Sequence, residues 1–351
     1  MELEHEVFTE WLNSSNVLMI SVFLISVITL PLLGFSLYAL KNYRKSTYYV
    51  CMYSITVANI VLLGTIATSV LMDTCPSIGQ IFHGSLMCKL RHFLVNVSSC
   101  FAHWTWVLMY VTRCIMVFFP LHARRNGCVL QGWLPIVGVL ICSFLTQLWT
   151  PILMTELTVR SNGTVASFCD VNSVLINANV VQTIAVTETL VTFFIPFALT
   201  VLTDISVLIM YRPCQPTFTL IPREDVGGDL CNSSYLKIVS KKNIEDWTQK
   251  RHVAIRRCLL MATINLFLTL PNYSLQLLDE FMNLRSGDSV SFFIWADTVA
   301  YILYLLQFML VPLYLYFLRS DLKRGSSRVA TRKADLSLNR DSGAAAVLDP
   351  N

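Results

Sequence analysis

The chain has 351 residues, of which 54% are hydrophobic and only 14% are charged, and 26 Lys and Arg exceed 22 Asp and Glu for a net charge of +4. Soluble domains carry about 25% charged residues, so this composition excludes a water-soluble protein of this size. The 13 Gly, 12 Pro and 11 Cys residues exclude a collagen-like, disordered or disulfide-scaffold chain. What remains is a membrane protein, and the small net charge gives no indication of a nucleic-acid partner.

Seven apolar runs are long enough to cross a bilayer of about 30 Å, which takes roughly 20 helical residues. They are Val17 to Leu40, Tyr48 to Met72, Lys89 to Phe119, Val129 to Met154, Asn177 to Met210, Ala254 to Phe281 and Val290 to Leu318. Runs such as VLLGTIATSVLM lack the alternating pattern of β-barrel strands. The predicted fold class is therefore all-α, a bundle of seven transmembrane helices.

The distribution of Lys and Arg predicts the orientation, because these residues favour the cytoplasmic side. One set of connections, including the tail, holds 22 of them, whereas the opposite set holds only Lys89, Arg91, Arg160 and Arg285. Segment 1–16 is therefore expected outside and segment 319–351 inside. Because residues 1–16 are acidic and lack the basic start of a cleavable signal, we expect the first span to act as a signal anchor.

Two Asn-x-Ser/Thr triplets, at Asn13 and Asn162, fall on the predicted outer side and predict N-glycosylation there. Three more, at Asn96, Asn232 and Asn272, fall inside spans or in the cytosolic loop and are expected to stay unmodified. The two outer triplets agree with the orientation that Lys and Arg indicate.

Residues at fixed spacing give the seven spans a specific resemblance. Cys88 opens the third span, Arg113 follows 25 residues later, and Pro120 lies seven residues after that. Later spans add Trp133 in the fourth, Pro196 in the fifth, Pro271 in the sixth and Pro312 in the seventh. In this order the residues resemble the rhodopsin-like class, class A, of G-protein-coupled receptors, over Val17 to about Lys323.

The resemblance implies a multi-pass receptor domain over 17–318 at the plasma membrane, which activates a heterotrimeric G protein by outward movement of its sixth helix. It also implies a short amphipathic eighth helix in FLRSDLKRG, followed by a tail that we expect to be disordered. Ser326, Thr331 and other hydroxyl residues of that tail are candidate phosphorylation sites for arrestin. The resemblance implies no cofactor and no enzymatic reaction.

Several positions depart from the family's activation motifs. Asn59 stands where the family has a sodium-binding Asp, and Thr269 stands where it has a large Trp. The other departures are Thr112 and Cys114 beside Arg113, Arg251 in place of a resting-state acid, and Val311 in place of the Asn before Pro312. The candidate activation residues are Asn59, Arg113, Pro196, Asp204, Pro271 and Pro312.

Asp204 is included because of its position relative to Arg113. A buried cation at membrane depth is costly unless it is paired or hydrated, and Arg113 lacks the acid that the family places beside it. Asp204 lies eight residues after Pro196, on the inner half of the fifth span. We hypothesise that Asp204 pairs with Arg113; the alternative is a hydrated Asp204 at the cytosolic interface.

Only three Cys residues, Cys75, Cys88 and Cys169, fall on the oxidising outer side. The resemblance implies a disulfide between Cys88 and Cys169 that holds the second outer loop over the mouth of a pocket. It leaves Cys75 without an assigned role. No Cys and His residues have the spacing of a metal site.

The resemblance places a ligand pocket in the outer half of the bundle. Candidate polar residues there are His92, Asn96, Ser99, Glu188, Tyr273, Gln276, Asp279, Tyr301 and Tyr304. Val95 occupies the position at which amine receptors carry an Asp, which argues against a monoamine, and the seventh span has no Lys for a retinal Schiff base. Glu188 is the strongest candidate, because an acid inside the membrane is a functional site by default; the alternative is a protonated structural Glu.

The predicted outer segments hold ten acidic residues against four basic ones, a distribution that concentrates cations. We therefore expect a basic peptide ligand, including peptides with an Arg near an amidated C-terminus, and the chain resembles divergent invertebrate neuropeptide receptors. A lipid or small-molecule ligand stays open, as does a receptor-like protein that binds a ligand or a partner receptor without G-protein signalling. The absence of an internal repeat argues against a transporter.

The predicted cytosolic loop over about 211–253 has two parts. Its first half is rich in Pro and Gly, and we expect it to be mobile. The second half and the start of the sixth span are basic, from Lys237 to Arg257. This stretch fits either a G protein or anionic membrane lipid as its partner.

Overall fold

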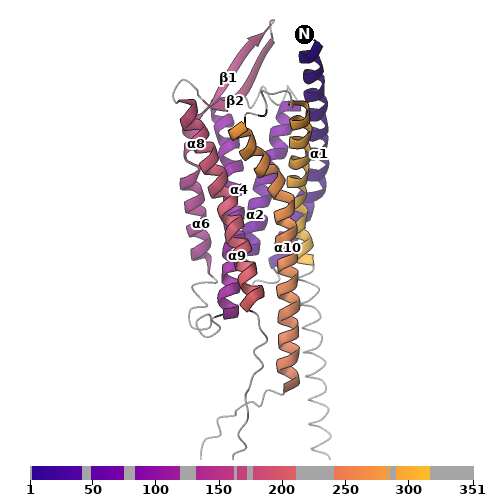
Figure 1. Cartoon of the computed structure of the whole chain (residues 1–351), viewed down its shortest axis with the longest axis vertical. Coiled ribbons are helices and arrows are strands. Elements are labelled where there is room, and N and C mark those ends of the chain that lie inside the picture. The colour runs from indigo at the N-terminus through magenta and orange to yellow at the C-terminus, as the bar shows by residue number, and fades with distance from the viewer. Residues whose placement is uncertain are drawn as a thin grey trace, which may run out of the picture.

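The computed structural model describes residues 2–41, 49–74, 84–118, 132–161, 164–171, 177–210, 241–282, 284 and 290–316. The elements are α1 (Glu2–Lys41), α2 (Tyr49–Thr74), α4 (Ser85–Phe118), α6 (Trp133–Thr146), α7 (Trp149–Leu153), β1 (Met154–Ser161), β2 (Thr164–Val171), α8 (Ala178–Thr189), the π-helix η1 (Leu190–Phe194), α9 (Ile195–Met210) and α10 (Lys241–Met282). A last helix, Val290–Tyr316, is called the 290–316 helix. Since only a turn separates α6 from α7, and α8, η1 and α9 are continuous, these described helices form seven long rods (Figure 1).

Five of the described rods are long and apolar enough to cross a membrane. They cover Thr9–Lys41, Tyr49–Met72, Trp133–Leu153, Asn179–Thr203 and Val290–Tyr316. The other two, α4 and α10, correspond to the predicted third and sixth spans and are more polar, with Lys89 and Arg91 near the start of α4. Length and composition thus identify a helical, membrane-embedded protein.

Many Ser and Thr hydroxyls inside the rods donate to a carbonyl of their own helix. The Ser36 hydroxyl donates to the Leu32 carbonyl at 2.8 Å, and the Thr56 and Thr105 hydroxyls each donate to the carbonyl four residues back at 2.7 Å. Because the hydrocarbon region offers no water as a partner, this local pairing lets hydroxyl residues lie in apolar helices at low cost.

Helix α4 lies at the centre of the bundle (Figure 1). It packs against α2, α6, α7, η1, α9 and both strands. Near the hairpin end, one core cluster joins Leu63 of α2, Phe193 of η1, Tyr273 of α10 and Phe308 of the 290–316 helix. A second cluster towards the other end includes Met52 of α2, Met109 of α4 and Tyr314 of the 290–316 helix. The inward-facing residues of α4 are thus surrounded by protein.

Helices α1 and α6 present apolar faces away from the bundle. The exposed side chains include Phe23, Phe35 and Tyr38 on α1 and Leu134, Ile141 and Leu145 on α6. A helix that is apolar on its outer face as well as its inner face is typical of a membrane span. These faces are therefore the surfaces that contact lipid.

An antiparallel β-hairpin stands at one end of the bundle (Figure 1). Strand β1 pairs with β2 from Met154 opposite Val171 to Ser161 opposite Thr164. A disulfide joins Cys169 of β2 to Cys88 of α4, with the two Cα atoms 5.7 Å apart. The predicted disulfide is present, and it fixes the hairpin against the start of α4. The hairpin itself is an addition to the all-α fold class that the sequence predicts.

Helix α1 begins before the predicted first span. Residues 2–16, which we expected as a separate outer segment, belong to this helix, and its apolar stretch starts at Thr9. Ser14 and Thr298 hydrogen-bond through their hydroxyls, and the Ser291 hydroxyl donates to the Glu10 carboxyl. This part of α1 therefore packs on the 290–316 helix.

Several predicted features lie at the edge of the described part or outside it. Asn13 is exposed on α1, within a helix and not in a loop, whereas Asn162 is outside the described residues, so both glycosylation sites stay predictions. Cys75, the loop segment 211–240 and the tail 317–351 with its eighth helix are also outside.

Replacing Cys169 by Ser is expected to lower the free energy of unfolding by about 2–5 kcal/mol, because the disulfide that restrains the unfolded chain is lost. Thermal unfolding of the purified protein in detergent measures the change. Cys142→Ser is the matched control, since Cys142 is a free, exposed cysteine on α6, and its unfolding temperature should stay that of the unmodified protein. Equal losses in the two variants would contradict a stabilising role for the bridge.

Candidate functional site

A network of hydroxyl groups lies inside the bundle where α4, α10 and the 290–316 helix meet. The Ser99 hydroxyl of α4 and the Tyr273 hydroxyl of α10 are 2.9 Å apart and both side chains are buried. The Tyr304 hydroxyl of the 290–316 helix interacts with both of them. It also interacts with Gln307, one turn further along its own helix. Three helices thus share one set of hydrogen bonds.

Aromatic rings surround this hydroxyl network. Phe193 of η1 stacks on Tyr273, with ring centroids 4.3 Å apart and an interplanar angle of 12°. The His103 ring of α4 meets both of these rings edge-on, at 5.8 Å from Phe193 and 5.7 Å from Tyr273. Tyr304 continues the contacts to Tyr301 and to Phe308. A shift of any one ring therefore disturbs rings on the other helices.

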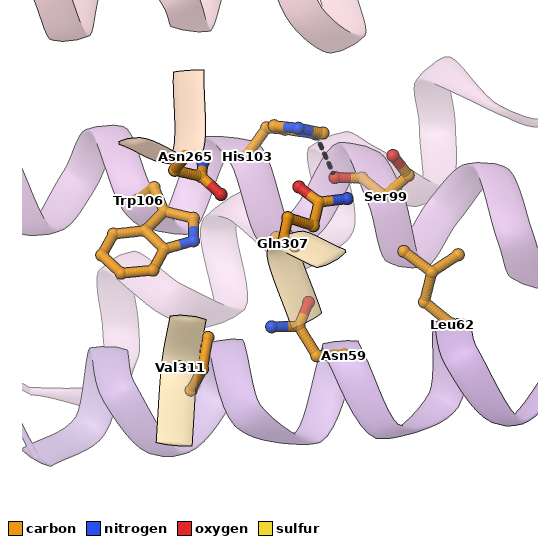
Figure 2. Close-up of a pocket in the computed structure, with 9 residues that line it drawn as sticks. Asn59, Leu62, Ser99, His103, Trp106, Asn265, Gln307 and Val311 are labelled. Atoms are coloured by element: carbon orange, nitrogen blue, oxygen red, sulfur yellow. Dashed lines mark hydrogen bonds between the residues drawn. The ribbon is translucent and has the colours of Figure 1, made fainter. Parts of the chain in front are cut away.

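The orientation of His103 is fixed by its own helix. Its Nδ1 atom lies 2.8 Å from the Ser99 carbonyl oxygen, as Figure 2 shows with a dashed line. Because a carbonyl oxygen only accepts, Nδ1 carries the proton and donates it. In the neutral ring Nε2 is then an acceptor.

Two small cavities adjoin the network and share His103, Trp106 and Asn265. The first, of about 10 Å³, is also lined by Asn59, Leu62, Ser99, Ala102, Gln307 and Val311 (Figure 2). The second, of about 30 Å³, is also lined by Tyr110, Phe193, Pro196, Phe197, Thr200, Leu266 and Thr269. Such volumes fit one or a few water molecules, which the amides and hydroxyls in the walls would hydrogen-bond. The side chains that Figure 2 labels around the first cavity include no carboxylate.

The π-helix η1 ends just before Pro196, and the missing N–H of this proline determines its hydrogen bonds. In a π-helix the Val191 carbonyl would accept from the residue five positions ahead, which is Pro196 and has no N–H. The residue four positions ahead, Ile195, already donates to the Leu190 carbonyl. The Trp104 indole N–H of α4 supplies the missing donor, 3.1 Å from the Val191 oxygen. This bond ties η1 to α4 and accompanies the inward placement of Phe193, which is 2% exposed.

Glu188 lies in α8, two residues before η1, and is partly buried. Its carboxyl group interacts with the side chain of Gln147, in the turn between α6 and α7. Its electrostatic influence reaches Cys100 of α4 and Tyr273 of α10. Glu188 therefore faces the interior of the bundle beside the hydroxyl network.

The structure brings together only part of the predicted ligand set. Ser99, Tyr273, Tyr301 and Tyr304 form one cluster, and Glu188 adjoins it. The remaining candidates lie nearer the hairpin end of their helices: His92 and Asn96 are partly buried on α4, Asp279 is partly buried on α10, and Gln276 is exposed on α10. None of these four contributes to the hydroxyl network described above.

The predicted activation residues divide in the same way. Asn59 lines the first cavity, Pro196 lines the second and ends the run of π bonds, and Pro271 and Pro312 lie within α10 and the 290–316 helix. The side chains of Arg113 and Asp204 are outside the described part. The residues next to them do meet, since the Cys114 thiol lies 3.6 Å from the Thr203 carbonyl oxygen. The pairing of Arg113 with Asp204 stays a prediction.

The site includes five residues that the sequence did not predict for it: His103, Trp104, Gln147, Asn265 and Gln307. The spacing along α4 is one signal for His103. Ser99 and His103 are four residues apart, and so are Trp106 and Tyr110. That spacing puts polar or amphipathic side chains on one face of α4. For Gln147, which stands between Thr146 and Leu148, the sequence gives no comparable signal.

No protein-family model and no curated protein matches this chain. Within the ranges that the structure covers, no group of three His, Cys, Asp or Glu side chains is placed to hold a metal ion. The class of protein therefore has to be inferred from the fold and from the buried network.

Replacing Trp104 by Phe is expected to lower the free energy of unfolding by about 1–3 kcal/mol, because the Val191 carbonyl is left without a donor. Trp133→Phe is the matched control: Trp133 is 51% exposed on α6 and touches Tyr53 only ring to ring. Thermal unfolding of both purified variants in detergent tests the expectation. If Trp104→Phe were as stable as the control, the indole bond would not be what stabilises η1.

Proposed function

We propose that the protein is a G-protein-coupled receptor of the rhodopsin-like class, with seven spanning helices, the hairpin outside and the free end of α10 in the cytosol. The observation that carries the proposal is the set of hydroxyl contacts from Tyr273 through Ser99 and Tyr304 to Gln307, beside the first cavity, with Glu188 within electrostatic range of Tyr273. These contacts run along the bundle from the hairpin side towards the middle of the bundle. A receptor needs such a connection if a ligand bound outside is to change the conformation on the cytosolic side.

The mechanism follows from which helices share the contacts. Tyr273 belongs to α10, the proposed sixth span, and Pro271 lies two residues earlier in the same helix. A ligand that bonds Glu188 or Tyr273 competes with the Ser99 hydrogen bond and with the stacked Phe193 ring. If it binds one arrangement of α10 more tightly than the other, it shifts the population towards that arrangement. Outward movement of α10 at its cytosolic end is the proposed result.

A basic peptide is the proposed ligand class. Glu188 offers a carboxyl group within the bundle, and Glu10 and Asp279 lie towards the outer ends of α1 and α10. The hairpin, held by the disulfide to α4, also presents a backbone edge to which an extended peptide can add. Acid side chains and a free strand edge together favour a peptide over a lipid.

The cytosolic partner is proposed to bind at the start of α10. This helix reaches beyond the ends of α4 and α9 (Figure 1), and its first turn carries Lys241 and Lys242. A heterotrimeric G protein is the proposed partner of this end, with arrestin as a further partner through the phosphorylated tail. Anionic lipid is the competing partner for the same basic residues.

A second candidate function is a receptor-like protein that binds a lipid, a small molecule or a partner receptor without G-protein signalling. It is favoured by the replaced motif residues, since Thr112, Cys114, Thr269 and Val311 stand where the resembled family has its switches. Ligand binding and nucleotide exchange, measured separately, distinguish the two functions.

A panel of basic, C-terminally amidated peptides is expected to contain one that stimulates nucleotide exchange on a purified G protein by the full-length receptor. Arg113→Ala and Glu188→Gln should each reduce the stimulated rate by about tenfold or more, because the proposal assigns each of them a charged contact, and such a contact is worth at least about 1.5 kcal/mol. Thr187→Val, on the exposed face of α8, is the matched control and should respond normally.

Each result of this assay decides something. Stimulation that both Arg113→Ala and Glu188→Gln abolish supports the signalling receptor. Peptide binding without exchange contradicts it and favours the silent receptor. Stimulation that survives Glu188→Gln would show that the ligand does not use this carboxyl group.

The receptor is expected to be insensitive to sodium, because the lining of the first cavity offers the neutral amides of Asn59, Asn265 and Gln307 and no carboxylate to offset the charge of the ion. Replacing sodium by potassium should leave peptide affinity unchanged. Asn59→Asp should create a sodium effect of about fivefold or more on affinity, with Asn265→Asp as a second variant that tests the other wall. A sodium effect in the unmodified protein would contradict this expectation.

A further inference from the structure

A second buried polar cluster lies on the other side of η1, between α4 and the α6–α7 turn. It consists of Cys100, Ser143, Thr146, Gln147, Thr150 and Thr192, all buried except Thr146. The Cys100 thiol lies 3.9 Å from the Thr146 hydroxyl, and the Gln147 Nε2 donates to the Thr192 hydroxyl at 3.4 Å. The proposed function does not use this cluster. Its position next to Glu188 gives it a role of its own.

Two buried polar atoms of the cluster, the Gln147 Oε1 and the Thr150 hydroxyl, lack a hydrogen-bond partner among the described residues, and of these only Oε1 is purely an acceptor. The Gln147 side chain is 1% exposed, and its Oε1 atom has no hydrogen-bond partner among the described residues. Its Nε2 donates one of its two hydrogens to the Thr192 hydroxyl. A buried amide oxygen without a donor is rare in native proteins, so a hydrogen from a neighbouring group is expected to fill this place.

Glu188 is the group that adjoins Gln147. The two side chains interact, and Glu188 lies one helical turn before Thr192 in the same rod. No salt bridge to Glu188 is present within the described part of the chain. The titratable groups whose charge interacts with it are the Cys100 thiol on α4 and the Tyr273 phenol on α10, and neither is a cation. An ionised Glu188 would therefore be an uncompensated charge in the membrane, which is costly.

We propose that in the ligand-free protein Glu188 carries a proton and that its O–H donates to the Gln147 Oε1. Gln147 then joins Glu188 to Thr192, with one hydrogen bond accepted and one donated. The Gln147 Oε1 then has a donor, and Glu188 carries no unpaired negative charge. Glu188 is then a site that exchanges a proton and not a permanently ionised carboxylate.

A consequence for recognition rests on the proposed function, namely on a cationic ligand. When a guanidinium or ammonium group reaches Glu188, the carboxyl proton leaves for the outer water and the N–H of the cation takes its place on the carboxylate. The carboxylate can no longer donate, so the Gln147 amide rotates: Nε2 donates to Glu188 and Oε1 accepts from the Thr192 hydroxyl. Thr192 precedes Phe193, so the charge of the ligand alters a hydrogen bond beside the aromatic rings. Gln147 is thus a positioning residue.

Infrared difference spectroscopy of the ligand-free, full-length protein in lipid nanodiscs tests the proton. The spectrum of the unmodified protein minus that of Glu188→Gln should contain the C=O stretch of a protonated carboxylic acid. Gln147→Met, which keeps the side-chain length but loses the amide, should shift this band. Asp297→Asn, a carboxyl of the 290–316 helix, is the matched control and should leave it in place. A difference spectrum without the band shows an ionised Glu188 and overturns the proposal.

Arginine amide, a soluble guanidinium compound, tests the exchange. It should remove the band, and its half-saturating concentration should fall about tenfold for each pH unit of increase while the acid stays protonated, because one proton leaves for each cation bound. A band that arginine amide leaves unchanged, or a pH-independent half-saturation, overturns the exchange. Failure here is distinct from failure of the receptor: peptide-driven nucleotide exchange without the band rejects the proton site alone, and the band without any exchange rejects signalling alone.

Discussion

The hydrogen bond from the Trp104 indole to the Val191 carbonyl is the interaction on which the interior depends. In a bilayer each backbone polar group needs a partner within the protein, and Pro196 removes the partner that η1 would otherwise give Val191. Because the donor comes from α4, the register between α4 and the rod formed by α8, η1 and α9 is fixed at this point. Phe193, two residues after Val191, then stacks on Tyr273 of α10, so three helices are held through one irregular turn.

The π-helix also separates two polar clusters. On one side Ser99, Tyr273 and Tyr304 share hydroxyl bonds among α4, α10 and the 290–316 helix; on the other, Gln147 bonds Thr192 across to the α6–α7 turn. Thr192 and Phe193 are adjacent residues, so η1 touches one cluster with its hydroxyl and the other with its ring. A rearrangement of the cluster beside Glu188 therefore reaches α10 without a long path. This geometry makes η1 a mechanical link between a membrane-buried acid and the helix proposed to move.

The sequence predicts the rods well because apolar runs of this length have few alternatives, and the resemblance supplies the Cys88–Cys169 bridge. It does not predict the hairpin, although Asn162-Gly163 between two short β-rich stretches is a turn signal; we read that triplet only as a glycosylation site. It gives Glu188, Ser99, Tyr273 and Tyr304 because each is polar within an apolar run. Roles for Gln147 and Trp104 could not be predicted, because both residues bond to η1, and the sequence does not show that this stretch forms a π-helix with an unpaired carbonyl.

In the proposed receptor, Thr269 stands where the resembled family has a large ring, and this difference changes what kind of switch the bundle can contain. The Thr269 hydroxyl donates back to the Asn265 carbonyl at 2.9 Å, and both residues line the cavity of about 30 Å³ that includes His103. A bulky aromatic side chain at this place could switch between two rotamers that pack differently against its neighbours. Here the same region holds amides, an imidazole and room for water, and exchanging one hydrogen bond for another changes the free energy by only about 1 kcal/mol. A ligand can easily bias free-energy differences of this size. In the proposed receptor the switch at this place is therefore hydrogen-bonded, where the resembled family has a steric one.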